Sequence, residues 1–190
     1  MKNPESGSTR FLTGSGGPTG SFTGTYITHP DFGFSGPGGV SDRHDLAVVL
    51  LDDAPGIAPA QLPTEGLLDE LRESSELRSG TFTAVGYGVV REDKTGGHHA
   101  LFVDGGRRFA TPSFQSLLAA WLNLSQQPST GDAGTCYGDS GGPHFLGGET
   151  SNLLVSITVT GDAPCRATDR TYRLDTASAR DFLGEFVDLP

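Results

Sequence analysis

The sequence predicts an all-β fold that ends in a short helix. Its 190 residues include 28 glycines and 12 prolines, a content typical of a turn-rich globular chain. The apolar residues fall mostly in short runs of strand length, and the last segment has the spacing of an amphipathic helix. The length allows one sizeable domain or two small packed units.

The first half of the chain predicts two strands followed by a helix. Residues 24–32, GTYITHPDF, alternate and contain aromatics, so they predict a strand that enters a loop at Pro30. Residues 44–52, HDLAVVLLD, form a β-branched apolar run typical of a buried strand. Residues 55–63 break this regularity and carry a weak linker signal. Leucines in residues 65–77 are spaced for a helix that ends before Gly80.

The second half predicts further strands and the terminal helix. Residues 81–90 read as a strand whose glycines permit a bulge, and residues 93–106 read as a polar loop. Short extended segments follow from Arg107, including a strand at residues 152–159. Thr176 is the expected N-cap of the last helix. Its apolar face would contain Ala179, Phe182, Leu183 and Phe186.

Charge and composition exclude several classes of partner and cofactor. The net charge of -10 and the pI near 4.7 argue against nucleic-acid or anionic-membrane binding through a basic surface. The longest apolar run, residues 46–51, is strand-sized, and the first residues lack the apolar core of a secretory signal peptide. The two cysteines lack zinc-ligand spacing. We expect no metal or organic cofactor. One disulfide or two free thiols both fit the composition.

The segment GTCYGDSGGPHF, residues 134–145, is the most informative motif. Ser140 lies between an aspartate and two glycines, which let the backbone turn sharply and bring its NH groups close to a ligand. A serine hydroxyl is a weak nucleophile until a positioned base takes its proton. The motif therefore predicts a nucleophile and requires a histidine or another base elsewhere.

Four segments together resemble the trypsin/chymotrypsin family of serine proteases, most closely its bacterial secreted members. They are GTCYGDSGGP, HDLAVVLLD, AVGYG and LVSITV, and the resemblance extends from about Gly24 to the C-terminus. It implies two antiparallel Greek-key β-barrels of the chymotrypsin type, the first incomplete, plus a short C-terminal helix. Residues 1–60 would be the remainder of the first barrel, residues 61–80 the connection, and residues 81–190 the second barrel.

The resemblance also implies a catalytic arrangement. Ser140 would be the nucleophile and Asp45 the carboxylate that orients a histidine, while the backbone NH groups of Gly138 and Ser140 would form the oxyanion hole. In the family's triad the serine follows the aspartate by about 93 residues, and here the separation is 140 minus 45, or 95. Cys136 and Cys165 would form a disulfide. Asp139 would pair with an N-terminal ammonium, and without one its loop would be disordered or use another donor.

The histidine of this arrangement is missing from its expected position. The triad spacing places it about 45 residues before Asp45, near position zero, so we expect it just upstream of Met1. His44 precedes Asp45 on a strand and would point to the opposite face. His29, His98 and His99 are expected to be surface residues, and His144 is expected to point away from the site.

Three interpretations account for the missing histidine: a truncated protease gene, a degenerate homologue kept for binding, or a piece that pairs with a histidine-bearing partner. We favour the first. The expected function is a serine endopeptidase that is inactive alone, acts on polypeptides and is secreted, although the chain as written would be cytoplasmic. The alternative is a noncatalytic module that uses the substrate cleft as a binding groove.

The resemblance finally assigns a substrate pocket. Gly134 would lie at its floor in place of an acid, which argues against Lys or Arg substrates. Thr135, Ser156 and Thr158 would contribute hydroxyls, and Arg170 would lie near the wall and favour Asp or Glu substrates.

Overall fold

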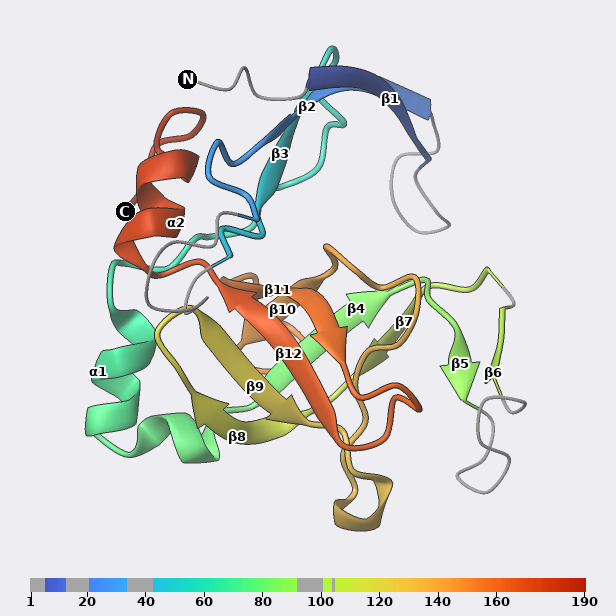
Figure 1. Ribbon diagram of the computed structural model, residues 1–190, viewed down its shortest axis with the longest axis vertical. Helices are drawn as coiled ribbons and strands as arrows, with labels where there is room; N and C mark the ends of the chain where they lie inside the picture. Colours follow the sequence, from blue (N-terminus) through green and yellow to red (C-terminus); the bar gives the residue numbers. More distant parts are fainter. Residues whose placement is uncertain (1–5, 13–20, 34–42, 92–100, 104) are drawn as a thin grey trace.

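The described part of the protein is mostly β, as the sequence predicted, with two short α-helices (Figure 1). The computed structural model describes residues 6–12, 21–33, 43–91, 101–103 and 105–190. Within these ranges no helix is both long enough and apolar enough to span a bilayer.

The largest element is a seven-stranded antiparallel sheet that curls into a half-barrel. Its strands are β4 (Phe82–Gly86), β7 (Arg108–Ala110), β8 (Ser113–Leu117), β9 (Trp121–Ser125), β10 (Pro143–Leu146), β11 (Leu154–Gly161) and β12 (Thr168–Arg173). Their order across the sheet is β7-β4-β10-β11-β12-β9-β8. Strand β10, which follows the GDSGG segment directly, is therefore central and paired on both sides.

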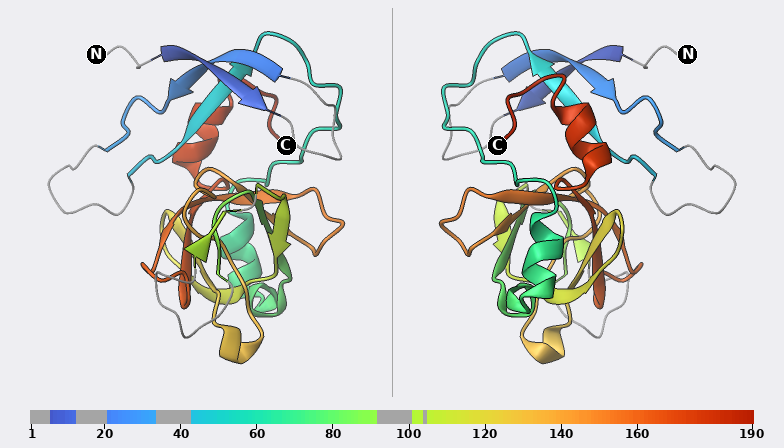
Figure 2. Two further views of the ribbon diagram at one scale, coloured as in Figure 1. Left: turned by 90° about the vertical axis from the view of Figure 1, so that its right-hand side faces the viewer. Right: turned by 90° about the vertical axis from the view of Figure 1, so that its left-hand side faces the viewer.

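A smaller sheet lies beside one end of the half-barrel (Figures 1 and 2). It contains β1 (Ser6–Leu12), β2 (Ser21–Thr28) and β3 (Ala47–Leu51) in that order. The prediction that residues 44–52 form a buried strand is wrong in its burial. In the described chain β3 pairs with β2 alone, and Leu50 is 44% exposed.

Residues 93–106 are also not entirely loop. β6 (Leu101–Phe102) pairs with β5 (Val90–Arg91) in a two-stranded ribbon. The prediction for residues 93–100 and 104 lies outside the described residues. The segment at residues 81–90 is divided, because β4 ends at Gly86 and β5 begins only at Val90.

The helices differ in how well the sequence predicted them. The segment at residues 65–77 is shorter and broken: α1 (Leu67–Glu73) is followed by a 3-10 turn, η1 (Glu76–Ser79). The break occurs because Ser75 adopts a left-handed conformation with φ 68°, which stops a right-handed helix. A second 3-10 turn, η3 (Pro128–Thr130), follows β9.

The C-terminal helix is confirmed as α2 (Ala177–Leu183). The Thr176 side chain accepts a hydrogen bond from the backbone NH of Ala179, as expected of an N-cap. Phe182 and Leu183 are buried on the predicted apolar face.

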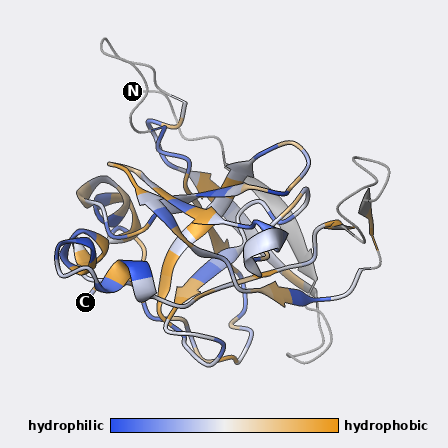
Figure 3. Ribbon diagram, turned by 90° about the horizontal axis from the view of Figure 1, so that it is seen from below, coloured by the Kyte–Doolittle hydropathy of each residue, from blue (hydrophilic) through white to orange (hydrophobic). Residues whose placement is uncertain are grey.

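Two clusters of buried apolar side chains hold the strands and helices together. Apolar segments of both strands and helices can be seen in Figure 3. One cluster fills the half-barrel beneath α1 and includes the fully buried Leu68, Phe82 and Val155. The other joins α2 to both sheets, with Leu46 from the segment entering β3 and Tyr172 from β12. This second cluster places the small sheet against the half-barrel next to the GDSGG loop.

Arg173 ties the half-barrel to α1 by a buried ionic network. Its guanidinium donates to both carboxylate oxygens of Asp175 and to Asp69. Burial alone would lower the pKa of Arg173, but the hydrogen bonds that the guanidinium donates to the two carboxylates outweigh burial and raise the pKa above its usual value. Asp175 also accepts the backbone NH of Leu68, so one carboxylate serves both elements.

Candidate functional site

Ser140 and Asp45 line one cavity between the small sheet and the half-barrel. Its volume is about 550 Å³, and most of its other walls are apolar, including Leu154, Ile157 and Leu183. Asp45 lies just before β3, and Ser140 lies in the turn that leads into β10. The two residues predicted for a triad, 95 positions apart, thus reach the same cavity from different sheets.

Glycines shape the turn around Ser140. Gly138 and Gly141 adopt φ values of 96° and 80°, a region that other L-residues rarely enter. Gly141 donates its NH to the carbonyl of Thr158 at 2.8 Å, and this pins the turn to β11. In the described chain the backbone NH groups of Gly138 and Ser140 have no protein acceptor. Both remain available to a ligand oxygen.

Asp139 is partly buried and braces this turn through two backbone NH groups. Its Oδ1 accepts the NH of Gly88 at 2.7 Å, and its Oδ2 accepts the NH of Cys136 at 2.9 Å. A Cβ at Gly88 would lie 2.6 Å from the carboxylate, and a Cβ at Gly86 would overlap it. Backbone NH groups therefore donate to Asp139 where the resemblance implied an N-terminal ammonium, because the two glycines leave room for the carboxylate.

Asp45 is half-buried and accepts no hydrogen bond from the described residues. Burial raises the pKa of Asp45, and the charge of Arg43 opposes this only in part. A carboxylate at the edge of a cavity with a raised pKa and no donor is poised to accept a proton or a hydrogen bond from a ligand.

The described histidines make other contacts, and the prediction that His29 lies at the surface is wrong, because it is 7% exposed. His44 has φ 49° and hydrogen-bonds through Nδ1 to the Ser178 hydroxyl at 2.8 Å, and its ring stacks on His29 with centroids 4.6 Å apart. His144 is fully buried in β10, with Nε2 3.0 Å from Asp169. None of the three lines the cavity shared by Asp45 and Ser140. His98 and His99 lie outside the described residues.

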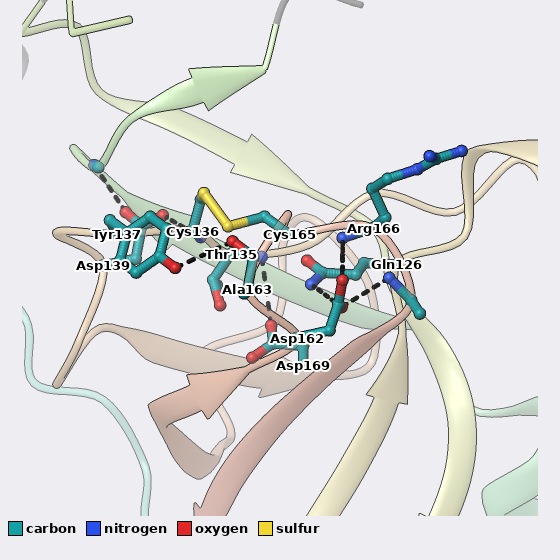
Figure 4. The surroundings of a disulfide bond; sticks show 12 residues. Gln126, Thr135, Cys136, Tyr137, Asp139, Asp162, Ala163, Cys165, Arg166 and Asp169 are labelled. Atoms are coloured by element: carbon teal, nitrogen blue, oxygen red, sulfur yellow. Dashed lines mark hydrogen bonds between the residues drawn. A yellow bond between two sulfur atoms is a disulfide. The ribbon is translucent and has the colours of Figure 1, made fainter. Parts of the chain in front are cut away.

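A second cavity of about 260 Å³ opens beside Ser140. Thr135, Thr158 and Asp162 are among the residues that line it. The predicted disulfide between Cys136 and Cys165 is confirmed and closes one wall (Figure 4). Tyr137 adds a further tie, because its hydroxyl donates to the carbonyl of Ala163 at 2.9 Å. The Ser140 loop and the loop after β11 are thus held together around the cavity.

The other residues predicted for a substrate pocket do not line this second cavity. Gly134 lines a neighbouring cavity of about 590 Å³. Ser156 is fully buried and accepts a hydrogen bond from Thr171 at 2.8 Å. Arg170 lies on the other side of the sheet, where Nε donates to Asn123 and the guanidinium sits 5.8 Å from the Trp121 ring centroid.

Strand register explains the position of Arg170. A β-bulge shifts the pairing of β11 with β12 between Thr158 and Thr160, and successive residues of a strand point to opposite faces. Asp169, the preceding residue, points inward instead and is 1% exposed. Its Oδ2 accepts the NH of Thr135 at 3.3 Å (Figure 4). No sequence motif marked this aspartate.

Gln126 was also missed. It is 3% exposed at the end of β9, lines the cavity beside Ser140, and occupies the space next to Gly134. A glutamine after a strand carries no signal that would have identified it.

Among the described residues no group of three His, Cys, Asp or Glu side chains converges to hold a metal ion. No family model matches the chain, and no curated protein sequence matches it.

Proposed function

We propose that the chain is the nucleophile-bearing part of a serine endopeptidase of the trypsin/chymotrypsin type. The half-barrel corresponds in this proposal to the second barrel, residues 81–190. The small sheet is the remainder of the first barrel, residues 1–60, with residues 61–80 as the connection. The observation that carries the proposal is the shared cavity of Ser140 and Asp45. The Cys136–Cys165 disulfide favours an oxidising, secreted setting.

The chemistry follows from the groups around the cavity. The hydroxyl oxygen of Ser140 attacks the carbonyl carbon of a peptide bond, and a base takes the hydroxyl proton. The NH groups of Gly138 and Ser140 hydrogen-bond to the oxygen as it gains negative charge. The base then gives its proton to the departing amine, leaving an ester on Ser140 that water hydrolyses. No metal or organic cofactor enters these steps.

The base in this proposal is an imidazole supplied from outside the described residues. Asp45 accepts no hydrogen bond from the described residues, and the cavity that it lines is also lined by Ser140. An imidazole in that space would donate one NH to Asp45 and accept the proton of Ser140. The same feature favours a second function, a noncatalytic module that binds an extended polypeptide in this apolar groove.

The test is phosphonylation of Ser140 by a fluorophosphonate, followed by intact mass and peptide mapping. We expect slow labelling of residues 1–190, and faster, saturable labelling when free imidazole is added. Ser140→Ala should abolish the imidazole-dependent part. Rapid stoichiometric labelling without imidazole would show that the chain already holds a base, and His98→Ala and His99→Ala would then locate it. A complete lack of labelling at saturating imidazole would favour the binding module.

A further inference from the structure

The two ends of the Ser140 loop are joined by one buried carboxylate. The loop starts at Thr135 and ends in β10 at His144, which is 144 minus 135, or nine, positions later. The backbone NH of Thr135 donates to Oδ2 of Asp169 at 3.3 Å, and Nε2 of His144 lies 3.0 Å from the same oxygen. Figure 4 shows the Thr135 end of this connection, which we call the Asp169 link.

The His144–Asp169 pair is enclosed in the half-barrel. Both side chains are 0% exposed. The residues that face the pair in register on the adjoining strands are uncharged; they are Ala84, Ser156, Gly161 and Leu124. A hydrogen bond between two groups in so dry a setting is stronger than one in water, and loss of either partner leaves the other unpaired.

The other charged side chains around the pair have partners of their own. They are Arg170 and Arg173, which donate to other side chains, and Asp139 and Asp162, which accept backbone NH groups. Among the described residues, His144 is therefore the titratable partner of Asp169. A nitrogen lone pair that faced the carboxylate would be repelled, so Nε2 of His144 carries a proton and donates it.

The Thr135 end of the loop leads directly to the oxyanion NH groups. Cys136, the next residue, donates its NH to Asp139 at 2.9 Å, and its carbonyl accepts the NH of Asp139 at 3.1 Å. The turn with Gly138 and Ser140 is thus fixed relative to this segment, and a shift of Thr135 would move both NH groups. A displacement of about 1 Å at a reacting centre can lower a rate about 10²-fold.

We propose that His144 and Asp169 are positioning residues that hold the NH groups of Gly138 and Ser140 where the oxyanion forms. Neither side chain lines the cavity shared by Asp45 and Ser140. His144 acts by donating to Asp169, and Asp169 acts by holding the loop where it starts. Their effect on the reaction rests on the proposed function, whereas the Asp169 link does not depend on the reactivity of Ser140.

The first measurement is the imidazole-accelerated acylation of Ser140 in residues 1–190 by a p-nitrophenyl ester. His144→Leu removes the donor and should lower the maximal accelerated rate about tenfold or more. The imidazole concentration at half-maximal rate should not change, because the cavity beside Asp45 stays intact. His144→Gln should keep most of the rate, since its amide can donate from the position of Nε2. Arg170→Met, on the opposite face of β12, is the control and should react like the wild type.

A double variant separates positioning from stability. His144→Leu with Asp169→Val replaces the whole pair by apolar side chains, a change that is often neutral for stability. Urea unfolding should therefore show an unfolding free energy close to that of the wild type, even if His144→Leu alone does not fold. The acylation rate should stay low, and the Thr135 amide should exchange faster with solvent, because its NH has lost its acceptor.

Two kinetic results would overturn the inference. Acylation at the wild-type rate in the double variant would mean that the pair serves stability alone. Equal losses in His144→Gln and His144→Leu would mean that the hydrogen bond from Nε2 is not what holds the loop.

Amide hydrogen exchange distinguishes failure of this inference from failure of the proposed function. If imidazole does not accelerate acylation of the wild type, the proposed function fails, and exchange at Thr135 still tests the Asp169 link. Faster exchange at Thr135 in the double variant would support the link in that case. Unchanged exchange would overturn it.

Discussion

The half-barrel and the small sheet differ in how many of their strands and polar side chains have partners within the described chain. In the half-barrel the Ser140 turn is braced by Asp139, closed by a disulfide and backed by a buried apolar cluster. In the small sheet β3 has one described strand partner, and Leu50 is exposed. Asp45 is half-buried with no described donor. The difference is that the Ser140 turn is held by groups of the described chain, whereas Asp45 has no hydrogen-bond donor among the described residues.

Breaking the buried network of the half-barrel should have the largest effect. Arg173→Met leaves the fully buried Asp175 without its guanidinium, and removing one partner of a buried ion pair costs about 3–5 kcal/mol. Urea unfolding should show a decrease of this size in the unfolding free energy. Arg72→Ala is the matched control, because the Arg72–Asp69 pair is exposed and should cost no more than about 1 kcal/mol. Equal losses would mean that Arg173 is not the tie between α1 and the sheet.

Removing the disulfide should have the second-largest effect on the unfolding free energy. Cys136 and Cys165 enclose a loop with a sequence separation of 29, and the chain-entropy estimate for that length is about 3.6 kcal/mol. We expect Cys136→Ser with Cys165→Ser to lower the unfolding free energy by up to that amount. Reduction of the wild type should give the same loss. An unchanged unfolding free energy would show that the other ties, such as Tyr137 to Ala163, already hold the loop.

Filling the space behind the Ser140 turn should have an intermediate effect. A methyl group at Gly86 overlaps the Asp139 carboxylate, and such overpacking costs about 1–3 kcal/mol. Gly86→Ala should also slow imidazole-dependent phosphonylation of Ser140, because the turn loses its brace. Tyr87→Ala is the control, since Tyr87 is 46% exposed. Normal labelling in Gly86→Ala would show that the reactivity of Ser140 does not depend on the position of the Asp139 carboxylate.

The smallest expected effect is that of Asp45→Asn, which should raise the unfolding free energy where the other substitutions lower it. Because the folded pKa of Asp45 is raised, the folded state holds the proton more tightly than the unfolded state. Ionisation of this group thus lowers stability as pH rises from its unfolded pKa through its folded pKa. Asp45→Asn should stabilise the chain at pH 7 by less than about 1 kcal/mol and flatten this pH dependence. Destabilisation by Asp45→Asn at pH 7 would reveal a donor that the described residues lack.

Sequence reasoning predicted features that depend on local pattern. The mostly β fold and α2 with its Thr176 cap followed from residue type and spacing, and the resemblance implied the Cys136–Cys165 pair. It failed where a single backbone angle or a pairing shift decides the outcome. Ser75 broke the helix at residues 65–77 through its φ, and the bulge after Thr158 set the side-chain faces of β12.

The residues of the candidate site also fall into two groups, those that a motif marks and those that only strand order and register place there. Ser140 and Asp45 were found because a motif and its spacing identify them, and the structure brings them to one cavity. Asp169 and Gln126 belong to no motif, and their positions follow only from strand order and register. Arg170 was placed in the pocket for lack of that register.

The central claim is that Ser140 needs only an imidazole held by Asp45 to become a nucleophile. The direct measurement is the rate at which a p-nitrophenyl ester acylates Ser140, followed by intact mass so that free imidazole hydrolysis is not counted. We predict that imidazole accelerates acylation of the wild type saturably, and that Asp45→Asn reduces the accelerated rate at least tenfold. An accelerated rate that is equal in Asp45→Asn, or acylation that persists in Ser140→Ala, would contradict the account.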